Sequence, residues 1–247
     1  MWNLLYQLAS PKSFYSLTGR LLSWLAICGG LLFSLGVIWG LVFAPADYQQ
    51  GEAFRIIYMH VPCAFLSMAL YACMGFWAFL LLVWRIKLAG IMLSVTAGLG
   101  ASMAFLALLT GSLWGKPMWG TWWVWDARLT SELILLFLYA SIIAVTNAAP
   151  NKEQGDKIAA ILTIVGLIDL PIIHYSVYWW NTLHQGATIS VLAKPKIHSS
   201  MLYPLLFTLA GLSLYSVLVI LLKARNELLC RERRQNWVKN LVERGGL

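Results

Sequence analysis

The amino-acid sequence predicts an all-α integral membrane protein, a bundle of six transmembrane helices. Hydrophobic residues make up 60% of the 247-residue chain and charged residues only 11%, whereas charged residues make up roughly 25% of a typical soluble domain. Six separate apolar stretches are long enough to cross a hydrocarbon core, which takes about 20 helical residues. The bilayer core offers no water to free backbone groups, so such segments cross it as α-helices.

The six predicted spans follow one another with no long soluble domain or repeat between them. They cover 21–43, 57–84, 88–114, 132–149, 158–180 and 199–222. Ala44-Pro45-Ala46 resembles a signal-peptidase site, but the apolar stretch before it is longer than the roughly 7–15 residues of a signal peptide. We therefore expect the first span to be retained, and the whole chain, 1–247, to form one membrane domain.

The placement of lysine and arginine predicts which side of the membrane each loop faces. Six spans put both termini on one side, and that side carries 13 of the 18 Lys and Arg residues, seven of them in a basic tail at 223–247. Because the positively charged side is usually cytoplasmic, we expect both termini in the cytoplasm and the segment 115–131 outside. The net charge of +8 then reflects topology and contact with anionic lipid, and no nucleic-acid partner is expected.

The outward segment is rich in tryptophan: four lie within seven residues, a fifth lies just upstream, and an acid and a base close the run. These residues are Trp114, Trp119, Trp122, Trp123, Trp125, Asp126 and Arg128. In a helix, at about 100° per residue, four of them would share one face: Trp119, Trp122, Trp123 and Asp126. One interpretation is an interfacial tryptophan belt. Because a belt is usually spread over several helix ends, we favour a platform for a large flat ligand that stacks on aromatic faces.

Two histidines are predicted on the same outer side. His60 lies at the outer end of the second span and His184 follows the fifth, 124 residues later. Imidazole suits iron, and haem proteins use histidine as an axial ligand, whereas a structural zinc site needs four close ligands. The sequence therefore favours haem held between these histidines, with Arg128, and less strongly Arg55, placed to pair with its propionates.

The remaining ionisable groups are interpreted as structural. Asp169 and His174 lie around Pro171 within the fifth span, where polar groups can satisfy a backbone carbonyl that proline frees. His198 lies where the sixth span begins. The four cysteines form no CxxC pair and are assigned no redox role.

The run from Trp119 to Thr130 resembles the WWD signature of haem-handling membrane proteins of cytochrome c maturation, and the length and six spans resemble the CcmC family within that group. The resemblance implies a protein of the bacterial inner membrane that holds haem b at its periplasmic face. It implies that His60 and His184 are the axial ligands and that the tryptophans and Asp126 contact haem. It also implies delivery to the haem chaperone CcmE, with CcmD and the ABC transporter subunits CcmA and CcmB as partners.

Two other functions stay open. A b-type cytochrome that carries electrons across the membrane would place its histidines deep in facing helices, whereas these two lie at one interface. A haem-exporting permease subunit of an ABC complex needs a separate ATPase chain, because no GxxxxGK[ST] motif occurs. The broken helices of many transporters are not expected here, with Pro171 the only hint. An enzyme is not expected, because no nucleophile–base pair is discernible.

Overall fold

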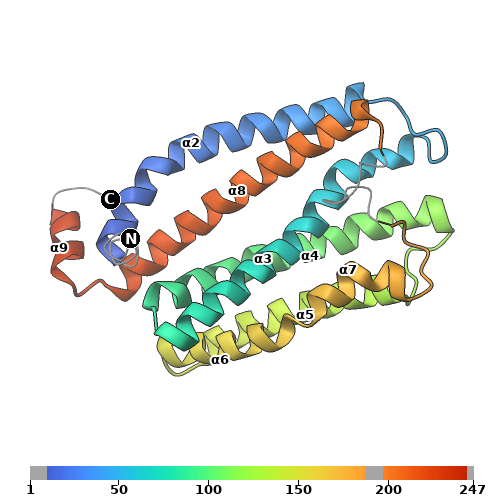
Figure 1. The fold of residues 1–247 in the computed structure, drawn as a ribbon. Helices are drawn as coiled ribbons and strands as arrows, with labels where there is room; N and C mark the ends of the chain where they lie inside the picture. Colours follow the sequence, from blue (N-terminus) through green and yellow to red (C-terminus); the bar gives the residue numbers. More distant parts are fainter. Residues whose placement is uncertain (1–9, 187–196, 244–247) are drawn as a thin grey trace.

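The computed structural model describes residues 10–186 and 197–243, and within these ranges the chain is almost entirely helical (Figure 1). The long helices are α2 (Pro11–Ile38), α3 (Ile57–Trp84), α4 (Lys87–Trp119), α5 (Ala127–Ala148), α6 (Lys152–Gly166), α7 (Asp169–Trp179) and α8 (Ser199–Arg231). Short elements are the π-helical turn η1 (Trp39–Phe43), the 3-10 turn η2 (Glu52–Ile56) and α9 (Asn236–Glu243). Within the described ranges, six helical segments are long and apolar enough to cross a membrane, as predicted, and the chain is a multi-pass membrane protein.

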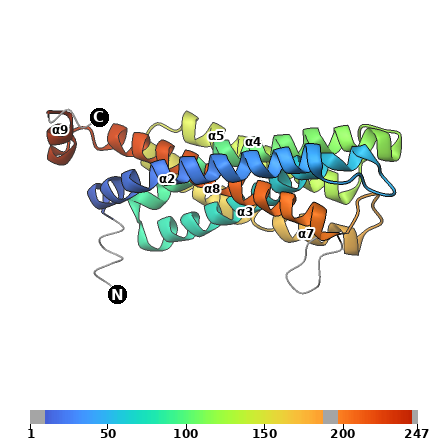
Figure 2. The same cartoon turned by 90° about the horizontal axis from the view of Figure 1, so that it is seen from above.

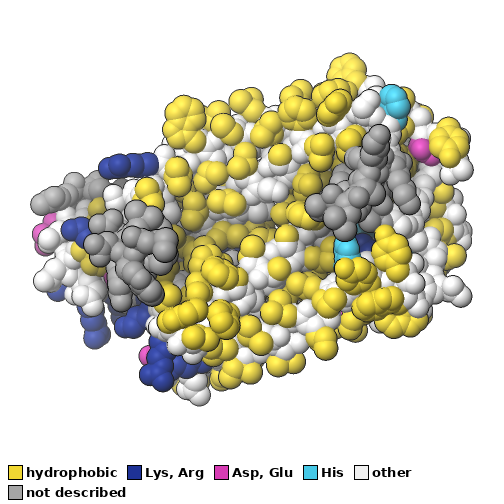
Figure 3. Space-filling model, in the orientation of Figure 1, with side chains coloured by type: hydrophobic (Ala, Val, Ile, Leu, Met, Phe, Trp, Pro, Cys, Tyr) yellow, Lys and Arg dark blue, Asp and Glu magenta, His cyan; other side chains and the backbone are white. Residues whose placement is uncertain are grey.

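The helices form two groups that run side by side. α3 and α4 pack along their length, and α5, α6 and α7 cover one side of them, while α2 packs almost wholly on α8 (Figures 1 and 2). The core of the larger group is built from α3 to α7, around Tyr71, Met74, Leu93 and Tyr139, all fully buried. Apolar side chains cover the middle of the surface, and most visible Lys and Arg gather at the end that carries α9 (Figure 3). This is the pattern of a protein with a lipid-facing belt.

The fifth span is interrupted, contrary to expectation. α6 ends at Gly166, and α7 starts at Asp169 after a turn at Leu167 and Ile168. Pro171 has no backbone N–H, so the bond that would continue the helix to the carbonyl of Leu167 cannot form. The break shortens α7 to 11 residues and brings its outer end, and the segment that follows it, beside α5.

Several helix ends lie beyond the predicted bounds. α4 continues through Trp114 to Trp119, where Gly120 takes a left-handed conformation (φ 76°) and donates its N–H to the carbonyl of Lys116. Residues 120–126 are therefore not helical, and the prediction that the tryptophans share a helical face is wrong. α8 runs to Arg231, so the tail predicted at 223–247 begins as helix, and Arg231 pairs there with Asp156 and Glu227.

Candidate functional site

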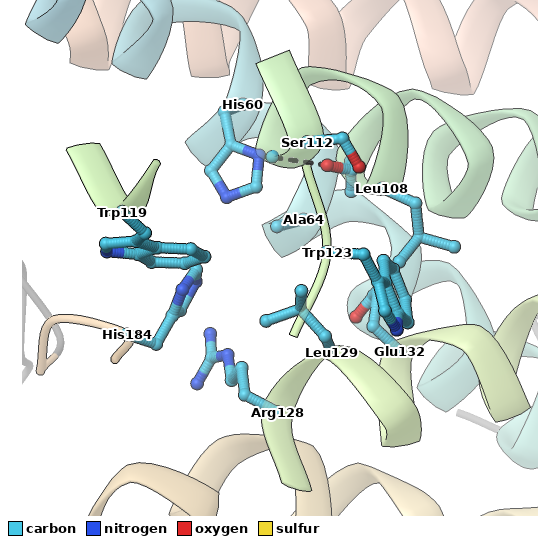
Figure 4. A pocket seen from close by; sticks show the side chains of 12 residues that line it. His60, Ala64, Leu108, Ser112, Trp119, Trp123, Arg128, Leu129, Glu132 and His184 are labelled. Atoms are coloured by element: carbon cyan, nitrogen blue, oxygen red, sulfur yellow. Dashed lines mark hydrogen bonds between the residues drawn. The ribbon is translucent and has the colours of Figure 1, made fainter. Parts of the chain in front are cut away.

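The two predicted histidines lie together at one end of the larger helix group, where α3 begins. His60 comes from the first turn of α3, and His184 comes from the segment that follows α7 (Figure 4). Their ring centroids are 6.0 Å apart and the rings are nearly perpendicular, at 75°. The fold thus joins two side chains that are 124 residues apart in the sequence.

His60 is held in a defined orientation from one side. Only 8% of its surface is exposed, and its Nδ1 lies 3.0 Å from the carbonyl oxygen of Ala107 and 3.1 Å from the hydroxyl of Thr110, both on α4. A carbonyl only accepts, so Nδ1 carries the proton and donates. The lone pair of Nε2 is then free for another partner, the arrangement that fixes the tautomer of metal-binding histidines.

His184 is a neutral imidazole with an unused nitrogen. Burial, helped by the positive charge of Arg128 and by His60, lowers the pKa of His184 to about 3. Its Nδ1 is buried and has no hydrogen-bond partner among the residues that the structure describes. The ring lies against the edge of Trp119, with centroids 5.7 Å apart. The Nδ1 nitrogen of His184 is available to a ligand or to a water molecule.

The two imidazoles line a cavity of about 40 Å³ together with side chains from other elements. Its wall comes from α3, α4, α5, the tryptophan segment and the segment after α7. The residues are His60, Ala64, Ala107, Leu108, Gly111, Ser112, Trp119, Trp123, Arg128, Leu129, Glu132 and His184. Of the predicted site residues, His60, His184, Trp119, Trp123 and Arg128 therefore line this cavity (Figure 4).

The other tryptophans of the signature lie outside the wall. Trp114 packs edge-on against His60 (5.6 Å between centroids) and donates its indole N–H to Gln50, at 2.9 Å. Trp122 and Trp125 are 54% and 75% exposed. Trp122 lies under the ammonium of Lys116, and Trp125 packs on Trp123. Only part of the expected aromatic platform therefore faces the histidines.

Asp126 and Arg55 are engaged by other parts of the chain. Asp126 is the N-cap of α5, where it accepts from the backbone N–H of Leu129 at 2.8 Å. It also accepts from the hydroxyl of Thr182. Arg55 pairs with Glu52 and donates to the carbonyl of Gly40 at 2.9 Å. Neither side chain lines the cavity.

Two charged groups enter the cavity from successive turns of α5. Arg128 donates to the carbonyl of Ile173 on α7, at 3.0 Å, which uses one of its five donors. Glu132, which the sequence analysis did not single out, accepts from the hydroxyl of Ser67 at 2.7 Å and is 7% exposed. The sequence did carry a signal for Glu132, because an acidic residue within a membrane span often has a function.

The geometry suits one metal ion between two nitrogen donors. An imidazole nitrogen lies about 2 Å from a metal ion that it binds, so two imidazoles that share one ion must both lie within a few ångströms of it. The observed 6.0 Å fits this arrangement. Within the described ranges, no group of three or more His, Cys, Asp or Glu side chains is placed to hold a metal ion. The site therefore combines two imidazoles with an apolar, aromatic wall.

These features define a class: multi-pass helical membrane proteins with a paired-histidine site beside a tryptophan-rich segment. The family model described as "Heme exporter protein C" (CcmC) matches residues 4–239. A "Heme exporter protein C" of Escherichia coli strain K12 is 49% identical over 246 residues, which cover 100% of this chain and 99% of the relative. Proteins of the same name from Haemophilus influenzae and Bradyrhizobium diazoefficiens are 48% and 45% identical, over 98% and 93% of this chain and 99% and 87% of the relatives. The chain belongs to the CcmC family.

Proposed function

We propose that this protein binds haem at the periplasmic face of the bacterial inner membrane, with His60 and His184 as the two axial ligands, and passes it to CcmE during cytochrome c biogenesis. The observation that carries the proposal is the 6.0 Å separation of two neutral imidazoles. Membership of the family and the names of the relatives support haem as the cargo. The haem is expected to be b-type, because the chain offers imidazoles to the iron and covalent attachment belongs to the chaperone.

The wall of the site favours a porphyrin over a bare metal ion. A structural zinc ion needs four nitrogen or sulfur ligands, whereas two axial histidines complete the coordination of an iron that already has four porphyrin nitrogens. Trp119 and Trp123 supply flat apolar surface on the cavity wall. The indole nitrogen of Trp123 is buried without a partner, so it can donate to a polar group of the cargo.

Arg128 is the proposed partner of a haem propionate. It lines the cavity and keeps donors beyond the one that Ile173 accepts. A guanidinium fork matches a carboxylate in geometry as well as in charge. Arg55 shares the outer side, but its bonds to Glu52 and Gly40 hold it away from the cavity. The propionate role therefore falls to Arg128.

The size of the cavity implies that its wall moves when cargo is exchanged. Binding sites for small molecules and cofactors enclose roughly 300–1,000 Å³, whereas this cavity has a volume of about 40 Å³. α3 and α4 are long helices packed on each other, while His184 lies in a segment without regular structure. We propose that this segment swings aside to admit haem and to release it.

The proposed arrangement in the membrane follows from the charge distribution. Both termini are placed in the cytoplasm and the tryptophan-rich segment outside, where CcmE can reach the edge of the haem. CcmD and the ABC subunits CcmA and CcmB are the proposed partners, and ATP hydrolysis belongs to a separate chain. This chain then acts as a binding and transfer subunit and not as an enzyme.

One observation favours the second candidate, a haem-exporting permease subunit. The fifth span is broken between α6 and α7, and broken helices form the substrate sites of many transporters. Both proposed ligands nevertheless lie at the outer end of the bundle, which favours capture on that side. A b-type cytochrome that transfers electrons across the membrane is disfavoured for the same reason.

The test is to purify the protein with its neighbours from membranes and to measure haem per chain and the absorption spectrum. We expect His60→Ala and His184→Ala each to lower haem content and to shift the Soret and α bands. His174→Ala is the matched control, because His174 is an exposed histidine on α7. Wild-type spectra from both ligand variants would remove these histidines as ligands.

A further inference from the structure

The segment that carries His184 has an alternating pattern of burial. Between Asn181 and Gly186, Thr182 and His184 are partly buried and the residues at the other positions are exposed. α7 has already ended at Trp179, where the N–H of Trp180 makes the last helical bond, to Ser176. Thr182 and His184 are thus the side chains by which this segment contacts the rest of the protein.

A chain of hydrogen bonds ties His184 to the start of α5. The backbone N–H of His184 donates to the hydroxyl oxygen of Thr182, at 3.0 Å. The Thr182 hydroxyl in turn donates to Oδ2 of Asp126. We name these three residues, Asp126, Thr182 and His184, the His184 tether. The single hydroxyl of Thr182 both accepts and donates, which is what fixes its direction.

Asp126 uses its two carboxylate oxygens for different neighbours. Oδ1 accepts from the N–H of Leu129 and caps α5, and Oδ2 receives Thr182. α5 also presents Arg128 to the cavity, two residues later in its first turn. The Asp126 carboxylate therefore fixes the start of α5 and, through Thr182, the position of His184. The bond from Thr182 to a carboxylate is charge-assisted, hence roughly twice as strong as a neutral one.

We propose that Asp126 and Thr182 are positioning residues for His184: they act on haem through this ligand and not by contact with the porphyrin. The inference rests on the proposed function, since it assigns a role toward the haem that His184 would hold. Asp126 thereby gains a role that its place in the tryptophan-rich signature does not reveal. Because the segment that carries His184 has no regular structure, the tether sets the equilibrium between a ligated and a released His184.

The principal test compares Thr182→Val, which keeps the shape of the side chain and removes the hydroxyl, with Thr182→Ser, which keeps the hydroxyl. Each purified complex is loaded with haem, and transfer of haem to apomyoglobin is followed by absorbance. We expect transfer from the valine variant to be about tenfold faster than from wild type, within the range found for outer-shell partners of metal ligands. The serine variant should behave as wild type, as should Asn181→Ala, a change at an exposed position of the same segment.

Spectra separate a positioning role from a merely structural one. In Thr182→Val we expect a Soret band shifted toward that of His184→Ala, and recovery of the six-coordinate spectrum when imidazole is added. If Thr182→Val fails to accumulate in membranes, Asp126→Asn serves instead, because asparagine is also a good N-cap while its amide removes the charge that Thr182 meets. A wild-type transfer rate and spectrum in these variants would overturn the inference.

The outcome for His184→Ala tells the two proposals apart. If that variant loses the wild-type spectrum while Thr182→Val and Asp126→Asn keep it, His184 is a ligand and the tether is not needed. If His184→Ala itself keeps the wild-type spectrum, the ligand assignment fails, and the positioning role fails with it.

Discussion

Gly111 of α4 lies directly against the imidazole of His60 on α3. A Cβ atom at this position would stand 3.0 Å from Cε1 of His60 and 3.5 Å from its Nδ1. The same ring is held from α4 by the carbonyl of Ala107. The histidine thus occupies a slot that exists because one residue of the facing helix has no side chain.

Gly111→Ala should therefore disturb the site without a change in any ligand. The added methyl group must push the His60 ring or lengthen its bond to Ala107, since the contact is closer than ordinary packing allows. We expect haem per chain to fall severalfold and the Soret band to move. Gly98→Ala on the same helix is the control, because the nearest atom to its new Cβ is Nζ of Lys223, at 3.7 Å. Equal haem content in both variants would contradict the idea that Gly111 makes room for the His60 ring.

Adjacent tryptophans should differ in their effect on haem. Trp123 lines the cavity and Trp122 is 54% exposed. Removal of Trp123 deletes the flat surface and the free indole N–H on the cavity wall, whereas removal of Trp122 deletes a group that Lys116 covers from outside. We expect Trp123→Ala to lower haem per chain at least threefold and Trp122→Ala to leave it near wild type, on the scale of roughly 0.5–1.5 kcal/mol for an aromatic contact. Similar losses in both would favour an interfacial belt.

The pairing of α2 with α8 should be separable from the haem site. A Cβ at Gly211 of α8 would collide with the backbone nitrogen of Phe33 on α2, and backbone cannot yield as a side chain does. Gly211→Ala should destabilise the protein by about 1–3 kcal/mol, the usual range for overpacking. Thermal unfolding in detergent measures this. Gly30→Ala is the control, since a Cβ there meets no atom within 4 Å.

In the residual folded Gly211→Ala protein, the haem spectrum should match wild type, because α2 makes few contacts with α3 and packs chiefly on α8. A shifted spectrum would show that the helix pair shapes the haem site.

The orientation of the chain can be read by labelling. In a variant whose four cysteines are replaced, Tyr48→Cys tests the loop between η1 and η2, where Tyr48 is 89% exposed. Glu153→Cys tests the opposite end, at the exposed start of α6. We expect a membrane-impermeant maleimide to label Tyr48→Cys in intact spheroplasts and Glu153→Cys only after lysis. The reverse result would place the tryptophan-rich segment in the cytoplasm.

The length of the apolar stretches was enough to predict the six spans found in the described residues, though not the break in the fifth, because a lipid solvent leaves the backbone little choice. The proximity of His60 and His184 was also predicted. An even number of spans between two positions puts both on one side of the membrane, and imidazole is a common ligand of iron. The prediction that the tryptophans share one helical face was wrong because of Gly120. This residue adopts a left-handed conformation and ends α4 at Trp119.

The parts of the site that were missed depend on contacts between distant segments. Glu132 gains its significance from Ser67, and Thr182 from Asp126, at separations of 65 and 56 residues. No local pattern in a single sequence encodes such pairs. Gly111 is likewise one of 19 glycines until the position of His60 is known.

The distance along the chain between the paired histidines bears on the biosynthesis of the protein. His184 leaves the ribosome after His60, and at rates of roughly 5–20 residues per second the intervening 124 residues take about 6–25 s. Three further spans are inserted by the translocon in that interval, while His60 has no counterpart. Under the proposed function, haem cannot be held between both histidines until His184 has been synthesised, so haem binding is expected only after that point.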